Sequence, residues 1–322
     1  MGIRIGINGF GRIGRNAARV ILNSQGLTLA AINSLSDTSS HEYLLKHDSV
    51  QGLFHTDIFK DPSLHIFQIK DPSQIPWDVD VVLECTGKAK TFEDARAHLR
   101  GTVKHVVVSA PTKDQTPTYV MGVNHTEYKK EPIVSNSSCT TNCVATVLKV
   151  LDVALGVTAG NMTTIHAATD SQNLLDNSHK KEIRLRRSSL VNIIPASSGS
   201  ATDVAKLFPH LAGKLPCCAI RVPTPTVSLI DLVVVVKRKT SKEEVNGLFQ
   251  KFSTTTLKGI LSVAAEELVS SDYIGSPFSS IVDPFLTDVV DGTLVHVTAW
   301  YDNEWGYANR LLELASYIYA YS

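Results

Sequence analysis

The stretch IRIGINGFGRIGRNAARVIL, residues 3–22, decides the fold of the N-terminal part of this chain. Its first residues, 3–7, predict a short apolar strand, and three glycines follow at once in a G-x-G-x-x-G spacing. Apolar residues then recur at helical spacing until Gly26 offers a C-terminal cap, and 27–33 predicts a second strand. Strand, glycine loop, helix and strand in this order predict the first unit of a parallel sheet.

The three glycines, Gly9, Gly11 and Gly14, match the dinucleotide-binding fingerprint. The first permits a tight turn, the second lets the backbone approach a pyrophosphate, and the third allows close packing of helix on strand. The free N–H groups of the helix N-terminus then face the anion. The fingerprint usually continues with an acidic residue at the end of the second strand, but Asn33 and Ser34 stand there. NAD and NADP are therefore both admissible, and hydrogen bonding of the ribose by Asn33 and Ser34 is the alternative interpretation.

Further buried strands over 79–83, 103–109 and 133–135 extend this pattern to a doubly wound, mainly parallel α/β sheet. The later runs at 163–166, 229–236 and 294–301 predict an α+β domain with a mostly antiparallel sheet. A capping box of Ser241 and Glu244 begins a helix there. We expect residues 1–138 plus 303–322 to form a Rossmann dinucleotide-binding domain and 139–302 a catalytic domain.

Composition limits the possible partners and location. The 322 residues contain 31 basic and 31 acidic side chains, and a net charge of zero gives no electrostatic reason to expect nucleic acid. No apolar run approaches the ~18 residues of a membrane helix. The N-terminus lacks the features of a signal peptide, and five cysteines suit free thiols in a reducing compartment. The sequence therefore predicts a cytoplasmic protein without a membrane or nucleic-acid partner.

The segment SCTTNC, residues 138–143, is the most specific signal of chemistry. A strand-like stretch precedes it and an amphipathic run follows, so Cys139 is predicted at a helix N-terminus, where the dipole favours a thiolate. No second ligand pair at zinc spacing accompanies the two cysteines, so we expect no metal and interpret Cys143 as packing. The remaining cysteines are interpreted as core residues: Cys85, Cys217 and Cys218. His166 ends a predicted strand and is either structural or the base that serves Cys139.

The motifs INGFGRIGR, SNSSCTTNC, TTIHAAT, NIIPASSG, RVPTPTVSLIDL, VSSDYIG and WYDNEWGY, taken in order, resemble the phosphorylating glyceraldehyde-3-phosphate dehydrogenase family along the whole chain. The resemblance implies oxidation of D-glyceraldehyde 3-phosphate with NAD or NADP and inorganic phosphate to 1,3-bisphosphoglycerate. Cys139 would form the thioester and His166 would be the catalytic base. It also implies a homotetramer, with the loop between Asp170 and Asn192 at a subunit contact, and a role in glycolysis or gluconeogenesis.

The same resemblance, with the fingerprint, gives the expected binding residues. Those for the cofactor are Asn8, Gly9, Gly11, Arg12, Ile13, Asn33, Ser34, Lys70, Ser109, Asn303 and Tyr307. Those for the substrate and for inorganic phosphate are Ser138, Thr140, Thr169, Ser198, Gly199 and Arg221. The alternative interpretation of Arg221 is an ion pair at the domain interface.

Several positions depart from the family pattern. Ser34 replaces the usual Asp, Ser178 stands where strictly NAD-dependent members often have Pro, and Lys70 matches a basic residue near the adenosine ribose. All three favour NADP or dual use. Leu185 occupies a position where many members carry an Arg near inorganic phosphate, so Arg184 or Arg187 is expected to replace it.

Two other functions stay open on the sequence. Erythrose-4-phosphate dehydrogenase, which hydrolyses the thioester, is favoured by INSLSD and Ala168, whereas the intact loop Ser197–Gly199 argues against it. A non-catalytic binding paralogue is the other alternative, and the retention of both Cys139 and His166 argues against it.

Overall fold

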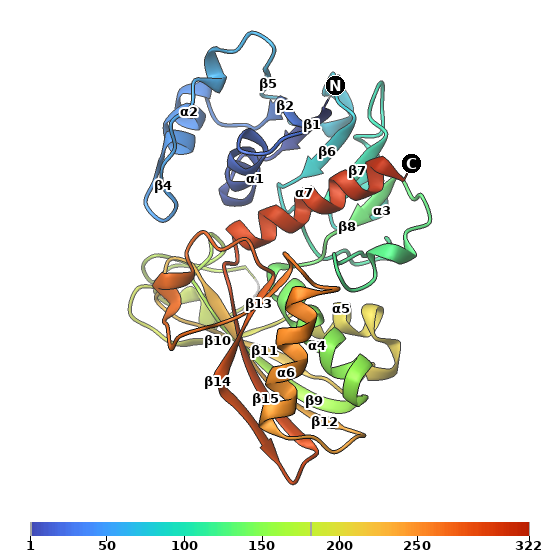
Figure 1. Ribbon diagram of the computed structural model, residues 1–322. Coiled ribbons are helices and arrows are strands. Elements are labelled where there is room, and N and C mark those ends of the chain that lie inside the picture. The colour runs from blue at the N-terminus through green and yellow to red at the C-terminus, as the bar shows by residue number, and fades with distance from the viewer. Residues whose placement is uncertain (1, 181, 322) are drawn as a thin grey trace. The chain divides into compact units, whose positions relative to one another are not determined.

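The computed structural model describes residues 2–180 and 182–321, which form two compact units (Figure 1). One unit contains the described residues of Met1–Ser138 and Tyr307–Ser322, and the other those of Cys139–Gly306. Residues 303–306 lie with the second unit, where the Asn303 side chain accepts a hydrogen bond from Ser228 Oγ at 3.1 Å.

The first unit is built on a parallel sheet of six strands in the order β5-β2-β1-β6-β7-β8. The strands are β1 (Ile3–Asn8), β2 (Leu27–Asn33), β5 (His65–Phe67), β6 (Val81–Glu84), β7 (His105–Val108) and β8 (Ile133–Ser135). Every residue of β6 and β7 is buried, as expected of parallel strands covered on both faces. Along the chain, strands β2 and β5 are added on one side of β1, and β6, β7 and β8 are then added on its other side. The carboxyl ends of β1 and β6 therefore mark the switch point where doubly wound sheets bind ligands.

Helices and short connections complete this unit. Helix α1 begins directly after the glycine loop, and it buries an apolar face that includes Ala17, Val20 and Ile21. Helix α3 begins with a capping box between Thr91 and Asp94. The bounds are α1 (Arg12–Leu22), α2 (Thr38–Lys46), α3 (Phe92–Arg96) and α7 (Trp305–Ala320), the short strands β3 (His47–Asp48) and β4 (Gly52–Leu53), and the 3₁₀ turns η1 (Ile58–Lys60), η2 (Pro72–Gln74) and η3 (His125–Glu127).

The second unit is built on a seven-stranded sheet in the order β10-β11-β9-β12-β15-β14-β13. The strands are β9 (Val157–His166), β10 (Ile194–Ser197), β11 (Cys217–Arg221), β12 (Ser228–Val236), β13 (Leu261–Val263), β14 (Ser280–Val290) and β15 (Leu294–Tyr301). Only the pairs β11/β9 and β13/β14 are parallel. The structure thus confirms the predicted fold class of a parallel Rossmann-type sheet with a separate, mostly antiparallel one.

Three helices and three 3₁₀ turns accompany this second sheet. They are α4 (Cys139–Leu155), α5 (Ser200–Leu207) and α6 (Lys242–Thr254), with η4 (Arg184–Arg186), η5 (Pro209–Leu211) and η6 (Ser270–Tyr273). Helix α4 packs on β12, β14 and β15 through its buried Val and Leu side chains. At α6, the Ser241 side chain accepts a hydrogen bond from the Glu244 backbone N–H, which is one half of the predicted capping box. The Glu244 carboxylate accepts from Arg238 and Thr240 instead of completing the box. Within 2–180 and 182–321, no helix is long and apolar enough to cross a membrane.

Candidate active site

A sharp turn presents Cys139 at the first position of α4. Strand β8 ends at Ser135, and Ser137 adopts a left-handed backbone with φ of 56°. That conformation costs a non-glycine residue ~1–3 kcal/mol and is found where surrounding contacts enforce it. Here the Ser137 N–H donates to Ser135 Oγ at 2.9 Å, and the Ser137 carbonyl accepts from the Tyr307 hydroxyl at 2.9 Å. The predicted helix start at Cys139 is confirmed.

An imidazole lies next to the thiol. His166 is the last residue of β9, and its Nε2 lies 3.6 Å from Cys139 Sγ. His166 is buried, and the edge of its ring faces Tyr301 with 6.1 Å between centroids. The structure therefore brings together the thiol and imidazole that the sequence singled out separately.

Arg221 contacts the other imidazole nitrogen. Parallel pairing of β11 with β9 places Arg221 beside His166, with Arg221 Nη1 2.6 Å from His166 Nδ1. The carbonyl of Ala167 lies 2.8 Å from the same nitrogen and also accepts from Arg221 Nη1 at 3.3 Å. Burial and then the Arg221 charge lower the pKa of His166 to about 3, so this imidazole is neutral at pH 7.

The thiol itself is not favoured as a thiolate in this arrangement. Burial raises the pKa of Cys139 above its ordinary value, whereas the Arg221 charge and hydrogen bonds involving Thr140 act in the opposite direction. Burial exceeds these contributions. The predicted stabilising effect of the helix N-terminus is present in the hydrogen bonds from the first turn of α4, but desolvation of the sulfur outweighs it in this arrangement.

A buried hydroxyl network supports the first turn of α4, and sequence reasoning missed its centre. The Tyr301 hydroxyl lies 2.9 Å from Thr140 Oγ1 and 2.8 Å from Thr164 Oγ1, and Thr164 Oγ1 donates to the Leu229 carbonyl. Tyr301 is fully buried at the end of β15. The Thr140 hydroxyl, expected at a phosphate, faces this network instead. The alternation of buried residues along 294–301 was the available signal for Tyr301.

Three other expected phosphate ligands, Thr169, Ser198 and Gly199, lie on loops of the second unit, whereas Ser138 ends the first unit. Thr169 follows His166 closely, and its Oγ1 lies 2.9 Å from Ser171 Oγ. Gly199 is exposed at the N-cap of α5, where no side chain caps the helix, and Ser198 Oγ accepts from the Ser200 N–H at 3.3 Å. Ser138 directly precedes Cys139. These N–H and hydroxyl groups have the chemistry of an oxyanion site.

The arginines expected to replace the one missing at Leu185 differ in their surroundings. Leu185 is buried, and Arg187 Nε bonds Asp176 at 2.8 Å. Arg184 instead lines a cavity of about 600 Å³ together with Ser197. Arg184 is thus the better placed of the two beside the serine loop.

The remaining cysteines differ in burial. Cys143 is fully buried, and Ser280 Oγ donates to its sulfur at 3.4 Å. Cys85 and Cys217 are partly buried, whereas Cys218 is exposed and lines the same cavity as Arg184. The prediction of a core position is wrong for Cys218, because neighbouring residues of a strand face opposite sides of the sheet. Among the described residues, no group of His, Cys, Asp and Glu side chains is arranged to hold a metal ion.

The glycine loop of the first unit fits a dinucleotide. Gly9 has φ of 95°, and a Cβ there would lie 2.7 Å from the Thr86 nitrogen. A Cβ on Gly14 would come within 2.1 Å of the Gly9 carbonyl oxygen, so the third glycine is required by packing. Gly11 is exposed, has open space around a Cβ, and is the N-cap of α1 without a capping side chain. The loop thus leaves backbone N–H groups at α1 for a pyrophosphate.

Other expected cofactor residues surround this loop. Ile13 lies in the first turn of α1, and the Arg12 guanidinium bonds the Asp48 carboxylate. Ser109 follows β7, and its N–H donates to the Glu84 carbonyl at 3.0 Å. In the second unit, the Asn303 amide oxygen accepts from Ser228, while its amide nitrogen makes no hydrogen bond with a described residue.

The amide of Asn33 already donates both of its N–H groups within the sheet. Its amide nitrogen donates to Asn8 Oδ1 at 2.7 Å and to the Ile69 carbonyl at 3.0 Å, and its oxygen accepts from the Ile69 N–H. Ser34 is partly buried at the strand end and Lys70 is exposed. Ser34 carries a hydroxyl and Lys70 an ammonium group, and neither of these groups repels a 2′-phosphate.

The parallel sheet with its glycine loop, and the thiol–imidazole pair on the second unit, define an NAD(P)-dependent oxidoreductase. Residues 3–92 match the glyceraldehyde 3-phosphate dehydrogenase NAD binding domain, and residues 138–303 match the C-terminal domain of the same enzyme. The chain is 45% identical over 328 residues to glyceraldehyde-3-phosphate dehydrogenase 1 of Bacillus cereus, covering 98% of both chains. It therefore belongs to the glyceraldehyde-3-phosphate dehydrogenase family, as the sequence predicted.

Two further relatives have similar identity. The enzyme of Geobacillus stearothermophilus is 42% identical over 331 residues, which cover 99% of this chain and 98% of the relative. The chloroplastic glyceraldehyde-3-phosphate dehydrogenase GAPA1 of Arabidopsis thaliana is 44% identical over 333 residues, which cover 98% of this chain and 83% of the relative.

Proposed function

We propose that this enzyme oxidises D-glyceraldehyde 3-phosphate with inorganic phosphate to 1,3-bisphosphoglycerate through a thioester on Cys139. The distance of 3.6 Å between Cys139 Sγ and His166 Nε2, at the start of α4, is the observation that supports it best. In this proposal residues 1–138 with 303–322 bind the dinucleotide and 139–302 carry out the chemistry. We propose in addition a role in glycolysis or gluconeogenesis in the cytoplasm.

Cys139 attacks the aldehyde carbon, forming a C–S bond and a thiohemiacetal. His166 Nε2 accepts the hydroxyl proton as the carbon is oxidised to the thioester. A nicotinamide bonded by Asn303 would supply the acceptor for the hydride that leaves this carbon. The first N–H groups of α4 stabilise the negative oxygen. A phosphate oxygen then attacks the thioester carbon, the C–S bond breaks, and the proton held by His166 Nε2 passes to the leaving sulfur, which regenerates the thiol of Cys139 and the neutral imidazole.

Each anion has its own set of ligands in this proposal. Arg221 and Thr169 bind the substrate phosphate, and Ser138, Ser198 and Gly199 bind inorganic phosphate, with Thr140 acting through the start of α4. When phosphate engages Arg221, His166 Nδ1 is left to donate to the Ala167 carbonyl, 2.8 Å away. Nε2 is then the nitrogen with a free lone pair. This tautomer is the one that the base function requires.

The cofactor is held by the glycine loop with Asn8, Arg12, Ile13, Ser34, Lys70 and Ser109, while Asn303 bonds the nicotinamide carboxamide and Tyr307 packs near its ring. We propose that NADP is accepted as well as NAD. The absence of a carboxylate at Asn33 and Ser34, the exposed Lys70 and the serine at 178 support this.

We also propose a homotetramer. Several large apolar side chains of the loop between Asp170 and Asn192, and just beyond it, are exposed: Leu174 65%, Leu175 68%, Ile183 77%, Val191 79% and Ile193 72%. Many exposed large apolar side chains on one segment support a subunit contact there, because apolar surface left open to water often marks a site of association. Light scattering would test it, with Ile183→Asp expected to yield smaller species and Glu182→Asp as a control.

A rate assay with purified variants tests the reaction. Cys139→Ser should reduce turnover by at least ~10³-fold and His166→Asn by ~10²–10⁴-fold, in line with the usual contributions of a nucleophile and a base. Omitting inorganic phosphate should abolish steady turnover of glyceraldehyde 3-phosphate. Full turnover without phosphate, with erythrose 4-phosphate preferred, would favour the hydrolytic alternative. Normal turnover of Cys139→Ser would eliminate the mechanism, and no turnover by the unaltered enzyme would favour the non-catalytic paralogue.

A further inference from the structure

The last residues of three neighbouring strands form one buried row across the parallel sheet. Asn33 ends β2, Asn8 ends β1 and Glu84 ends β6, and backbone pairing places all three in register. Asn33 Nδ2 donates to Asn8 Oδ1 at 2.7 Å, and Asn8 Nδ2 donates to Glu84 Oε2. All three side chains are at most 4% exposed. The side chains thus join the strand ends at the switch point of the sheet.

Two groups that can only donate, the Ile69 N–H and the Trp77 indole N–H, determine which atom donates and which accepts in the hydrogen bonds between the side chains of the row. The Ile69 N–H donates to Asn33 Oδ1 at 2.9 Å, so the Asn33 amide nitrogen faces Asn8. Asn8 accordingly presents its oxygen to Asn33 and its nitrogen to Glu84. An indole N–H also only donates. At the far end, Trp77 Nε1 donates to His98 Nδ1 at 3.1 Å, which places the imidazole proton on Nε2, facing Glu84 at 3.1 Å.

Glu84 is where these donors converge. Its Oε2 accepts from Asn8 and His98, and its Oε1 accepts from the Thr86 hydroxyl and from the Thr86 N–H at 2.9 Å. Although burial raises the pKa of Glu84, hydrogen bonds from His98, Thr86 and Asn8 lower it by more, so the net shift is downward. An ionised carboxylate accepts all four hydrogen bonds without itself donating. Glu84 is therefore a buried carboxylate whose charge is stabilised by the hydrogen bonds from Asn8, His98 and Thr86.

The row is directly connected to the glycine loop. Gly9 follows Asn8, and its N–H donates to the Asn33 carbonyl at 2.8 Å. The Cys85 N–H donates to the Asn8 carbonyl at 2.7 Å, and Thr86, held by Glu84, is the residue that a Cβ on Gly9 would strike. A displacement of Glu84 would therefore move both Asn8, which precedes Gly9, and Thr86, which lies against Gly9.

We propose that Glu84 is a positioning residue for dinucleotide binding, which holds Asn8 and Thr86 so that the loop beginning at Gly9 keeps the shape needed by a pyrophosphate. His98 Nε2 donates to the Glu84 carboxylate, and Trp77 fixes the His98 tautomer that makes this possible. This inference rests on the proposed use of the loop for the cofactor. Loss of this positioning weakens cofactor binding without altering the thiol site.

The test variant is Glu84→Gln. Gln has the size of Glu, but its NH₂ group donates and would face the donors of Asn8 and His98 or those of Thr86. At least one buried donor then loses its acceptor, and we expect the Kd for NAD⁺, measured by calorimetry below the melting temperature, to rise about tenfold. Steady-state kinetics should show a higher KM for the dinucleotide with little change in kcat. The rate of Cys139 alkylation without cofactor should be unchanged.

A double variant distinguishes a positioning role of Glu84 from a general effect on stability. In the double variant Asn8→Asp/Glu84→Gln, the new Asp accepts from Asn33 and from the Gln amide, while the Gln oxygen remains for Thr86 or His98. The polarity of the row is restored, so this variant should regain most of the affinity that Glu84→Gln lost. A rescue of this kind would not follow from a general loss of stability.

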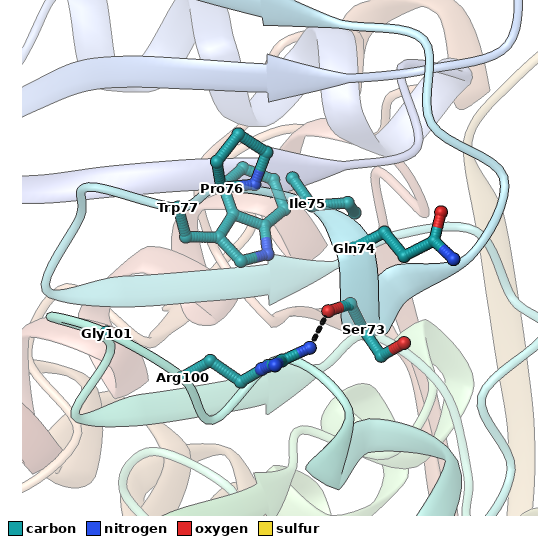
Figure 2. Close-up of a pocket in the computed structure, with 7 residues that line it drawn as sticks. All are labelled: Ser73, Gln74, Ile75, Pro76, Trp77, Arg100 and Gly101. Atoms are coloured by element: carbon teal, nitrogen blue, oxygen red, sulfur yellow. Dashed lines mark hydrogen bonds between the residues drawn. The ribbon is translucent and has the colours of Figure 1, made fainter.

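Arg100→Gln provides the matched control. Figure 2 shows Arg100 and Trp77 lining one cavity, whose volume is about 500 Å³, with Arg100 bonded to the Ser73 carbonyl and outside the row. This variant should bind NAD⁺ as the unaltered protein does. An unchanged Kd in Glu84→Gln, or an equal loss in Arg100→Gln, would overturn the proposal. If the unaltered enzyme itself did not bind NAD⁺ or NADP⁺, the proposed function would fail instead.

Discussion

Arg221 Nη1 lies 2.6 Å from His166 Nδ1, so a permanent cation contacts the imidazole that faces Cys139 from its other side. Parallel pairing of β11 with β9 places the two residues in register, and the contact is therefore built into the sheet. The Arg221 charge disfavours an imidazolium. In the free enzyme, His166 is consequently a neutral group that cannot stabilise a thiolate by its charge.

The contact predicts how stability depends on pH. Burial and Arg221 lower the pKa of His166 from its ordinary 6.5 to about 3, so between these values the unfolded chain binds a proton that the folded protein does not. Stability should therefore fall as the pH drops from about 6.5 towards 3. Arg221→Gln removes the smaller cause of the low pKa, and the loss of unfolding free energy between pH 7 and about pH 4 should shrink, because only near the folded pKa does a change in that pKa affect stability.

Urea unfolding at the two pH values measures this effect. His166→Asn is the control, because it removes the titrating group and should also flatten the dependence. Equal pH dependence in the unaltered protein and in both variants would contradict the assignment.

The elevated pKa of Cys139 predicts slow alkylation of the free enzyme at neutral pH. Burial raises this pKa and Arg221 opposes the rise, so the iodoacetamide rate should still increase above pH 8, and Arg221→Gln should be slower at that pH. Peptide mapping by mass spectrometry would separate Cys139 from the exposed Cys218, which serves as the internal reference. A rate that levels off below pH 7 would show that the helix N-terminus outweighs burial.

Local patterns made the main elements predictable. The glycine loop and the start of α4 at Cys139 follow from residues within one or two turns of each other, where spacing decides the structure. The contact of Arg221 with His166 joins residues 55 apart in sequence, and the bond from Asn8 to Glu84 joins residues 76 apart. Both depend on strand register, which a single sequence leaves open. The exposure of Cys218 was missed for a related reason, because an apolar doublet in a strand does not reveal which member faces inward.

Ser34→Asp should shift cofactor choice towards NAD. Both N–H groups of the Asn33 amide already donate, to Asn8 and to Ile69, so the hydroxyl of Ser34 is the next side-chain group at this strand end. Lys70 directly follows Ile69 in sequence. A carboxylate at position 34 would repel a 2′-phosphate but accept a hydrogen bond from a 2′-hydroxyl. The kcat/KM for NADP⁺ should fall at least ~10-fold relative to that for NAD⁺.

Ser34→Asn is the matched variant, since it has the shape of Asp without its charge. It should leave the ratio of the two kcat/KM values within ~3-fold of the unaltered enzyme, whereas a like charge costs much more. If Asn and Asp changed the ratio equally, the side chain at 34 would act by size, and the electrostatic interpretation would be wrong.

Two glycines of the loop should differ sharply when each is replaced by Ala. A Cβ on Gly14 would lie 2.1 Å from the Gly9 carbonyl oxygen, a distance that backbone atoms of the loop and α1 cannot accommodate without moving apart. A Cβ on Gly11 would meet no atom within 4 Å, and Gly11 has no positive φ. We therefore expect Gly14→Ala to lower the melting temperature and Gly11→Ala to leave it unchanged.

Gly11→Ala should nevertheless raise the Kd for NAD⁺, because its methyl group occupies the space through which a pyrophosphate approaches the N–H groups of α1. Thermal melts with and without NAD⁺ measure both effects, since a bound ligand raises the midpoint by mass action. Gly11→Ala should melt as the unaltered protein does without NAD⁺ and gain less from its addition. An equal gain would show that the pyrophosphate does not pass close to Gly11.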